Sequence, residues 1–309
     1  MKARTCKAPV IPKEGAGVVE KAARCDKNVL ILGETGTGKD VTARRVHELS
    51  NRREHPFVAI NCASLPDDLV EAELFGYARG SFTGAVRDKE GLLEAAGNGT
   101  VFLDEIGELP FPLQAKVLRM IDKRETRRIG ETVTRTVTAR FIFATNRDLE
   151  EEVRTGRFRR DLYFRINVVR IRLPPLRERR EDIPRLVHHI LERENERDRT
   201  RKDLSPEALG RLMTYDYPGN IRELENIIER AFVLCEDAII RDEDLIFEGH
   251  SRASEKDGLV TPEILRETLA SCRWNKTKAA GEIGRSRRHL YRLLEKYRMD
   301  DCIRRIFFP

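Results

Sequence analysis

Three glycines and one lysine lie within eight residues in the stretch GETGTGKD, at positions 33–40. The stretch follows the apolar run NVLIL and precedes a helical pattern that begins DVTARRVHEL. Glycines allow backbone N–H groups to converge on phosphate oxygens at a helix N-terminus, and Lys39 adds a positive charge for the β- and γ-phosphates. Asp40 follows the lysine, where Ser or Thr is usual, and a glycine-rich turn without a ligand is the alternative interpretation. The predicted nucleotide contacts are Gly33, Glu34, Thr35, Gly36, Thr37, Gly38, Lys39 and Asp40.

Two adjacent carboxylates follow another apolar run, in GTVFLDEIGEL. Asp104 is suited to bind Mg²⁺ through water, and Glu105 is suited to be the base that orients the attacking water in ATP hydrolysis. We expect their strand about one sheet neighbour away from the strand that leads into the phosphate-binding loop (P-loop). Acidic residues at a strand end can also be merely solvated, but their combination with GETGTGKD favours an ATPase that uses Mg²⁺.

Phosphoryl transfer also needs groups that detect the γ-phosphate and neutralise the charge that develops on it. Asn146 ends the apolar run RFIFATN and is a candidate sensor. Arg159 and Arg165 lie six residues apart in RFRRDLYFR, on a predicted helix, where ion pairing with Asp161 or its neighbours is the alternative role. Arg222 begins a helix in PGNIREL and could reach the nucleotide from a second subdomain; a surface arginine is the alternative there.

Alternating strands and helices are predicted to position these residues. Helical patterns such as DVTARRVHEL and PLQAKVLRMID separate several short apolar runs that are rich in β-branched residues. This order predicts an α/β fold over residues 28–174, with a mainly parallel sheet and helices on both faces. The five predicted strands are NVLIL (28–32), FVAIN (57–61), TVFLD (100–104), RFIFATN (140–146) and VVRIRL (168–173).

The strand signals stop after Pro174-Pro175, and helical patterns follow. DIPRLVHHILERENER, SPEALGRLMTY and NIRELENIIERAFVL have apolar residues at helical spacing and start with Asp, Ser or Asn. They predict a helical lid subdomain over residues 175–248. GHSRASEKDG (249–258) reads as a polar linker, and a small all-α domain is expected over 259–302.

Composition and charge limit the class of protein. The chain has 309 residues, 40% hydrophobic and 36% charged, which is enough for about two globular domains. No apolar run reaches the ~18 residues of a membrane span, and the N-terminus has no apolar secretion signal. The cysteines show no C-x-x-C pair, so we expect reduced thiols in a cytoplasmic protein; they are Cys6, Cys25, Cys62, Cys235, Cys272 and Cys302.

The positive charge is concentrated at one end of the chain. Residues 251–309 carry 14 Lys and Arg against 8 Asp and Glu, which accounts for the whole net charge of +6. A basic block can be just a solvated face, but confinement to a small module favours a polyanionic partner.

Six motifs in this order resemble the central AAA+ domain of sigma-54-dependent transcriptional activators. They are GETGTGKD, ELFGYARGSFTGA, GTVFLDEIGELP, RFRRDLYFRINV, LPPLRERREDI and YPGNIRELEN, and the resemblance covers roughly residues 28–250. It implies a P-loop ATPase that forms a ring, a hexamer, and remodels the closed promoter complex of the sigma-54 RNA polymerase holoenzyme. The roles it implies are Walker A at 33–40, Walker B at Asp104 and Glu105, sensors at Asn146 and Arg222, and arginines acting across a subunit boundary at Arg159 and Arg165.

One glycine-rich, apolar stretch has its explanation in this resemblance. GSFTGA is similar to the family's GAFTGA loop, which contacts sigma-54 and pushes on it, with Ser81 in place of the usual alanine. Glycines would let the loop rise and retract, and Phe82 with Thr83 would form its tip; the alternative is a hairpin whose Phe82 packs into the core. The resemblance also implies that Asn61 and Glu94 couple nucleotide state to the loop. The predicted partner contacts are Gly80, Ser81, Phe82, Thr83, Gly84 and Ala85.

The C-terminal piece resembles the Fis-type helix-turn-helix that ends many such activators. TPEILRETLASC and NKTKAAGEIG would be the first two helices, and RSRRHLYRLLEKY the recognition helix on double-stranded enhancer DNA, bound as a dimer. A basic amphipathic helix that packs on its own domain is the alternative. The residues expected to face phosphates or base edges are Arg285, Arg287, Arg288, His289, Tyr291 and Arg292.

The chain also departs from the family pattern. Residues 1–27 lack the family's Gly-x-Ser-Pro opening, a region that helps hold adenine, and Asp40 replaces the usual glutamate. No receiver or sensory domain is recognised before the ATPase, so we expect either a separate regulatory protein or a chain that is a fragment. An ATP-driven activator is the favoured function; the alternatives are another AAA+ remodeller and a DNA-binding regulator with an inert ATPase.

Overall fold

The computed structural model describes residues 13–64, 66–247, 262–272 and 276–282, together with Leu290, Leu293, Leu294 and Tyr297. The chain divides into two compact units, Met1–Ile246 and Phe247–Pro309, which are treated separately below.

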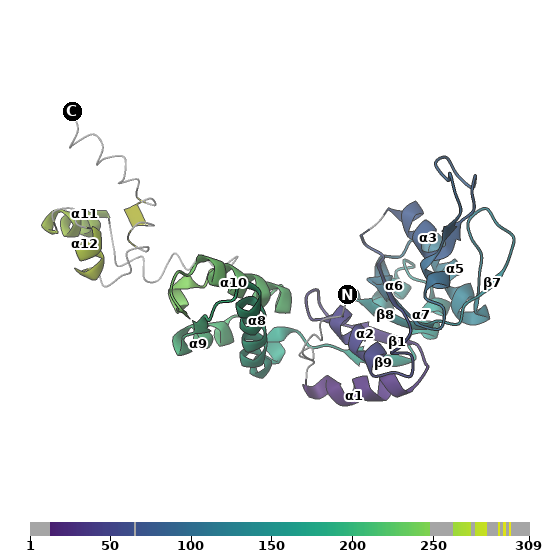
Figure 1. Cartoon of the computed structure of the whole chain (residues 1–309), viewed down its shortest axis with the longest axis horizontal. Coiled ribbons are helices and arrows are strands. Elements are labelled where there is room, and N and C mark those ends of the chain that lie inside the picture. Colours follow the sequence, from purple (N-terminus) through teal and green to yellow (C-terminus); the bar gives the residue numbers. More distant parts are fainter. Residues whose placement is uncertain are drawn as a thin grey trace. The chain divides into compact units, whose positions relative to one another are not determined.

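A five-stranded parallel sheet is the centre of the first unit (Figure 1). Its strand order is β2-β5-β8-β1-β9, and every neighbouring pair is parallel. All five predicted strands are confirmed, with differences of at most two residues at their ends. The strands are β1 (Val29–Leu32), β2 (Phe57–Asn61), β5 (Thr100–Asp104), β8 (Arg140–Thr145) and β9 (Val169–Arg172).

Alternate residues of these strands enter two apolar cores, one on each face of the sheet. Leu30 packs into one core, whereas Val29 and Ile31 pack into the other. Each fully buried aliphatic side chain of this kind contributes about 1.5–3 kcal/mol to folding. The Leu30 face is covered by α3 (Asp67–Phe75), α4 (Leu92–Ala95), α5 (Phe111–Lys123), α6 (Leu149–Arg154) and α7 (Arg160–Ile166), and the other face by α1 (Lys13–Arg24) and α2 (Lys39–Glu48).

Helix α1 was not expected from the sequence. Two glycines lower its intrinsic helix propensity, although its apolar residues gather on one helical face. Val19, Ala22 and Ala23 are nevertheless buried in the core against the sheet. The buried Arg140 donates to the carbonyl oxygens of Ala22 (2.6 Å) and Ala23 (3.3 Å), and so satisfies the C-terminal end of the helix. Tertiary contacts therefore determine this helix.

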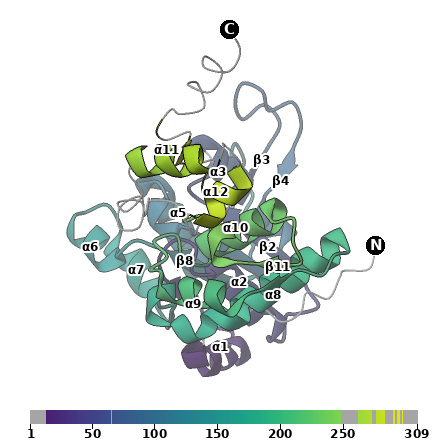
Figure 2. The ribbon, with the colours of Figure 1, turned by 90° about the vertical axis from the view of Figure 1, so that its left-hand side faces the viewer.

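Two β-hairpins extend from the Leu30 face. β3 (Gly76–Tyr77) and β4 (Lys89–Glu90) flank the GSFTGA stretch, and their connecting loop projects away from the sheet in both views (Figures 1 and 2). β6 (Glu125–Thr126) and β7 (Arg135–Thr136) form the second hairpin. The two are joined at Ile129, whose N–H donates to Gly76 O and whose carbonyl accepts from Ala78 N, both at 3.0 Å.

The helical lid follows the sheet, as predicted. Figure 2 shows α8, α9 and α10 as neighbouring helices, and the bounds of α10 match the predicted NIRELENIIERAFVL. Ser205 caps α9 by accepting from Ala208 N (3.2 Å). The lid consists of α8 (Ile183–Asp198), α9 (Pro206–Thr214), α10 (Asn220–Leu234), the strand pair β10 (Asp203–Leu204) and β11 (Ile239–Ile240), and the 3₁₀ turns Leu176–Glu178, Arg180–Asp182 and Asp242–Asp244.

The second unit contains α11 (Pro262–Ser271) and α12 (Lys276–Glu282), which confirm the first two helices predicted for it. Leu290, Leu293 and Leu294, at helical spacing, share one apolar core with Leu265, Leu269, Cys272 and Ala279 of this unit. The predicted DNA contacts lie outside the described residues; they are Arg285, Arg287, Arg288, His289, Tyr291 and Arg292.

Candidate functional site

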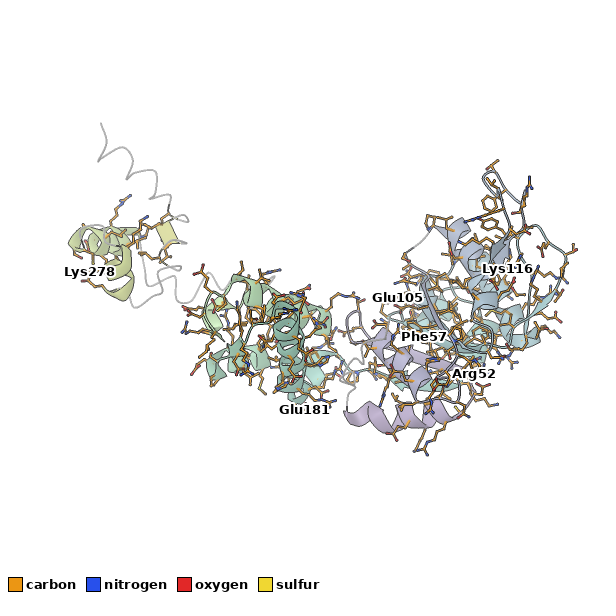
Figure 3. The ribbon with its side chains drawn as sticks, viewed as in Figure 1. Arg52, Phe57, Glu105, Lys116, Glu181 and Lys278 are labelled. Carbon is orange, nitrogen blue, oxygen red and sulfur yellow. The ribbon has the colours of Figure 1, made fainter. Side chains whose placement is uncertain are left out.

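Three predicted site elements meet at one edge of the sheet. Because the strands are parallel, β1, β5 and β8 all end there, and lead into the P-loop, Glu105 and Asn146 respectively. β8 lies between the other two strands. Glu105 Oε2 accepts from Asn146 N at 3.0 Å, and Asn146 Nδ2 donates to Thr35 Oγ1 at 3.0 Å. The fold thus joins residues from three separate motifs in one network (Glu105 is labelled in Figure 3).

The P-loop has the backbone shape that phosphate binding requires. Gly36 and Gly38 have φ angles of 80° and 92°, which other residues rarely adopt, and α2 starts directly afterwards. Lys39 is buried at the centre, where Nζ donates to Gly33 O at 3.1 Å and pairs with Glu105 Oε1 at 3.0 Å. The loop therefore presents a helix N-terminus and a lysine to one point, which fits a nucleoside polyphosphate.

The two carboxylates of the site differ in environment. Burial, and next the charge of Glu105, raise the pKa of Asp104 above its usual range, while Lys39 acts in the opposite direction. Glu105 has left-handed backbone angles (φ 51°), which cost a non-glycine residue about 1–2 kcal/mol and aim its side chain at Lys39 and Asn146. The raised pKa of Asp104 means that its negative charge is unfavourable in this environment, and a divalent cation bound there would offset that charge.

A dedicated metal cage does not occur in the described parts of the chain, where no group of three or more His, Cys, Asp or Glu side chains could hold an ion. Magnesium in phosphate sites usually keeps several waters and takes only one or two carboxylates besides the substrate's phosphates. The position of Asp104 at the end of β5, next to Glu105, suits that mode of binding.

The lid packs directly on the P-loop. Ile221 N donates to Gly36 O at 2.9 Å, and a Cβ at Gly36 would lie only 2.3 Å from Gly219 O. The same Cβ position is 3.3 Å from Cβ of Arg222, so this predicted residue lies beside the loop.

Three further lid residues contact the P-loop and were missed by the sequence analysis: Arg177, Arg179 and Asn220. All three stand in motifs already noted, LPPLRERREDI and YPGNIRELEN, but neither motif says which residue faces the nucleotide loop.

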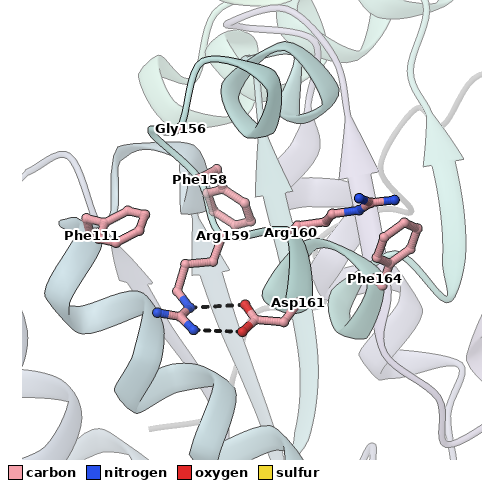
Figure 4. A pocket seen from close by; sticks show the side chains of 7 residues that line it. All are labelled: Phe111, Gly156, Phe158, Arg159, Arg160, Asp161 and Phe164. Atoms are coloured by element: carbon pink, nitrogen blue, oxygen red, sulfur yellow. Dashed lines mark hydrogen bonds and ion pairs between the residues drawn. The ribbon is translucent and has the colours of Figure 1, made fainter.

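Arg159 and Arg165 are engaged elsewhere in the subunit. Arg159 makes two parallel contacts with Asp161 (Nη2 to Oδ2 2.7 Å) in a surface pocket that also contains Phe111 (Figure 4). Arg165 pairs with Asp122 at 2.5 Å. These ion pairs are the alternative role considered for both arginines.

The backbone of Arg165 lies at the opposite edge of the sheet from the P-loop. Its carbonyl accepts from Asn28 Nδ2 at 3.0 Å, and Asn28 directly precedes β1. The P-loop starts after the other end of this strand, about 16 Å away at the usual rise of a β-strand. Arg165 therefore does not reach the P-loop of the same chain.

The GSFTGA loop exposes its tip and anchors its base. Phe82 is 44% exposed and contacts Tyr77 edge-on, with ring centroids 5.0 Å apart, so the alternative of a core phenylalanine is wrong. Thr83 is exposed and Ala85 is buried. Ser81 packs against Gly130 of the second hairpin, and its buried hydroxyl has no hydrogen-bond partner among the residues that the structure describes.

Comparison with known protein families identifies the family to which this chain belongs. Residues 12–172 match the Sigma-54 interaction domain, 177–261 the AAA+ ATPase lid domain, and 262–297 the Bacterial regulatory protein, Fis family. The chain belongs to the sigma-54-dependent transcriptional activators. The family match begins at residue 12, so it includes α1, a region that lacks the expected opening motif.

Curated relatives agree with this assignment. The response regulator protein PilR of Pseudomonas aeruginosa is 43% identical over 297 residues, covering 91% of this chain and 67% of PilR. The transcriptional regulatory protein GlrR of Escherichia coli is 44% identical over 285 residues, covering 90% of this chain and 64% of GlrR. The chain thus spans about two thirds of the length of these relatives.

Solved structures of NtrX from Brucella abortus share the fold. The complex with ATP has a TM-score of 0.73 at 28% identity, over 94% of this chain and 70% of NtrX. The complex with ADP has a TM-score of 0.72 at 28% identity, over 93% and 69%. The predicted fold class is confirmed: an AAA+ α/β domain, a helical lid and a C-terminal helix-turn-helix region.

The two coupling residues predicted from the family have different surroundings. Glu94 is held by Arg128 through two contacts (3.0 and 2.7 Å), next to Ile129, which joins the two hairpins. The Asn61 side chain is engaged locally, since its Oδ1 accepts from Ala63 N at 2.8 Å. The Glu105 carboxylate of the nucleotide site has other partners, Lys39 and Asn146. A role for either residue in coupling stays a prediction.

Two remaining expectations concern the whole chain. Within the described ranges, no helix of this family member is long and apolar enough to cross a membrane. Four of the six cysteines are described, and all four are free thiols: Cys25, Cys62, Cys235 and Cys272.

Proposed function

We propose that this family member is a transcriptional activator that hydrolyses ATP and uses the energy to remodel the closed complex of sigma-54 RNA polymerase. The observation that carries the proposal is the network of Lys39, Glu105, Asn146 and Thr35 at the carboxyl edge of the sheet. It supplies a cation for the phosphates, a carboxylate base and a polar sensor in one place.

In the proposed reaction, Lys39 and the P-loop N–H groups bind the β- and γ-phosphates. Glu105 orients a water molecule and takes up its proton as the water oxygen bonds to the γ-phosphorus, and the bond from that phosphorus to ADP breaks. The products are ADP and inorganic phosphate. Mg²⁺, held through water by Asp104, would neutralise phosphate charge when bound. Asn146 contacts both Glu105 and the P-loop, so it can report whether the γ-phosphate is present.

Arg159 and Arg165 would complete the site of a neighbouring subunit. The distance of Arg165 from the P-loop of its own chain supports action across a subunit boundary. A ring, which we propose is a hexamer, closes such head-to-tail contacts. Each arginine must then leave its present carboxylate partner, Asp161 or Asp122, to reach a phosphate.

The exposed tip of the GSFTGA loop would hold sigma-54. Phe82 and Thr83 are the exposed side chains at the tip, and the loop base is anchored to the second hairpin through Gly76 and Ala78. Movement of that hairpin would therefore move the loop. The basic C-terminal unit would bind enhancer DNA as a dimer, in the cytoplasm where promoter DNA and polymerase are located.

The test measures ATP turnover per subunit against protein concentration, and promoter opening with sigma-54 holoenzyme in the same preparation. Specific ATPase activity should rise with concentration as subunits assemble. Alanine at Arg165 should remove that rise while single subunits still bind ATP. A chain that binds ATP but hydrolyses none at any concentration would instead be a DNA-binding regulator with an inert ATPase.

A further inference from the structure

Glu34 places a negative charge inside a loop that binds phosphates. It is the second residue of GETGTGKD, where a free carboxylate would repel a nucleotide. In this structure the carboxylate is engaged entirely from the lid. Arg177 donates to both of its oxygens, at 2.9 and 2.6 Å, and Asn220 Nδ2 donates to one of them at 3.1 Å.

Asn220 links three segments of the chain. Its side chain is fully buried, and its backbone has a φ of 54°, a conformation that asparagine tolerates better than most residues. Nδ2 also donates to Thr35 O at 3.0 Å, and Oδ1 accepts from Leu176 N at 2.8 Å. One side chain therefore ties α10, the start of the lid and the P-loop together.

Further contacts hold the next two P-loop carbonyls. Ile221 N donates to Gly36 O, and the buried Arg179 donates to Thr37 O, both at 2.9 Å. The carbonyl and N–H of a trans peptide group point in opposite directions. Since the carbonyls of Thr35 and Thr37 face the lid, the N–H groups of Gly36 and Gly38 face away from it, toward the side on which phosphates bind.

We propose that Arg177 and Asn220 are positioning residues for the nucleotide. Together they neutralise Glu34, and Asn220, along with Ile221 N and Arg179, turns P-loop carbonyls toward the lid, so that the loop presents N–H groups to the phosphates. The inference rests on nucleotide binding at this loop. The hydrogen bonds from Arg177, and next from Asn220, hold the pKa of Glu34 at about 2, so the carboxylate is charged at any working pH.

The test is a double-mutant cycle on equilibrium binding of MgATP, measured by calorimetry. Arg177→Gln should weaken binding about threefold to tenfold, the effect of one partly screened charge near an anionic ligand. Glu34→Gln in the same chain should restore most of the affinity, because the repulsive carboxylate is gone. In turnover assays the single change should raise KM and leave kcat within about twofold, and high salt should reduce the defect.

Arg180→Gln is the matched control. Arg180 stands in the same segment, pairs with Asp216 at 2.6 Å and donates to Met213 O, and its contact with Arg177 goes to the backbone carbonyl (3.3 Å) and not to the guanidinium that holds Glu34. This control should bind MgATP like the wild type. The proposed neutralisation of Glu34 would be overturned if the double variant bound MgATP as weakly as Arg177→Gln. Wild-type affinity for MgATP in Arg177→Gln would overturn it as well. Failure of the wild type to bind MgATP would instead refute the proposed function.

Discussion

Replacing Glu105 with glutamine should separate ATP binding from hydrolysis, and the structure indicates that the two should change in opposite directions. Lys39 Nζ lies 3.0 Å from Glu105 Oε1, and the two side chains are only 7% and 14% exposed. A phosphate that binds to Lys39 must compete with this ion pair. Glutamine keeps the shape of the side chain but removes the charge, and its single amide oxygen can accept from Asn146 N or from Lys39 Nζ, not from both.

The size of each effect follows from these contacts. The negative charge opposite Lys39 is removed, which weakens this pair by about 1 kcal/mol and corresponds to roughly fivefold tighter ATP binding. A positioned general base contributes about 10²- to 10⁴-fold to rate, so kcat should fall by that factor. Lys39→Ala should behave differently, because it removes a charge from the phosphates and weakens binding itself.

The assay is equilibrium binding of MgATP followed by single-turnover hydrolysis on the same preparation. Glu108→Gln is the matched control: Glu108 stands three residues later and pairs with Arg147 instead of Lys39. It should bind and hydrolyse ATP within about twofold of the wild type. Hydrolysis by Glu105→Gln at the wild-type rate would refute the assignment of the base, and weaker binding would refute the competition between Glu105 and phosphate.

Three further predictions concern the loop, the DNA-binding unit and pH. Phe82→Ala or Thr83→Ala should preserve ATP turnover but abolish promoter opening; wild-type opening in both would mean that the loop is structural. Alanine at Arg287 and Arg288 should flatten the plot of log DNA affinity against log salt by about 0.9 for each phosphate that is no longer neutralised, measured by fluorescence anisotropy; an unchanged slope would contradict the recognition helix. Burial lowers the pKa of His47 in the folded protein, so on acidification the unfolded chain binds a proton at a higher pH than the folded chain does. Stability is therefore lost as the pH falls below about 6.5. His47→Gln should therefore show a smaller drop in urea-unfolding free energy on acidification than the wild type.

Local patterns predicted most of the regular elements. β2 and β5 have the predicted bounds, because alternating or continuous apolar residues define a buried strand without knowledge of its neighbours. The pattern was insufficient for α1, which contains Gly15 and Gly17 and depends on burial against the sheet. Strands of two residues, such as β3 and β6, are too short to have a period.

The nucleotide site could be predicted motif by motif. The P-loop, Glu105 and Asn146 each follow an apolar strand directly, and that position implies a shared edge in a parallel sheet. Their mutual contacts could not be predicted, because no single segment determines the order of the strands in the sheet. β8 lies between β5 and β1, although it comes last of the three in the chain.

The sequence by itself determined the glycine-rich loop after a strand, the carboxylate pair at a strand end and the basic C-terminal unit, because glycine geometry, charge and apolar period act over a few residues. Its motifs, taken together, carried the resemblance to the AAA+ family. Only the tertiary structure decided which lid side chains serve the P-loop. Glu34 and Asn220 are 186 positions apart, and their contact exists because α10 packs on the P-loop at Gly36. An arginine or asparagine in a polar segment has many possible partners, and packing selects one of them.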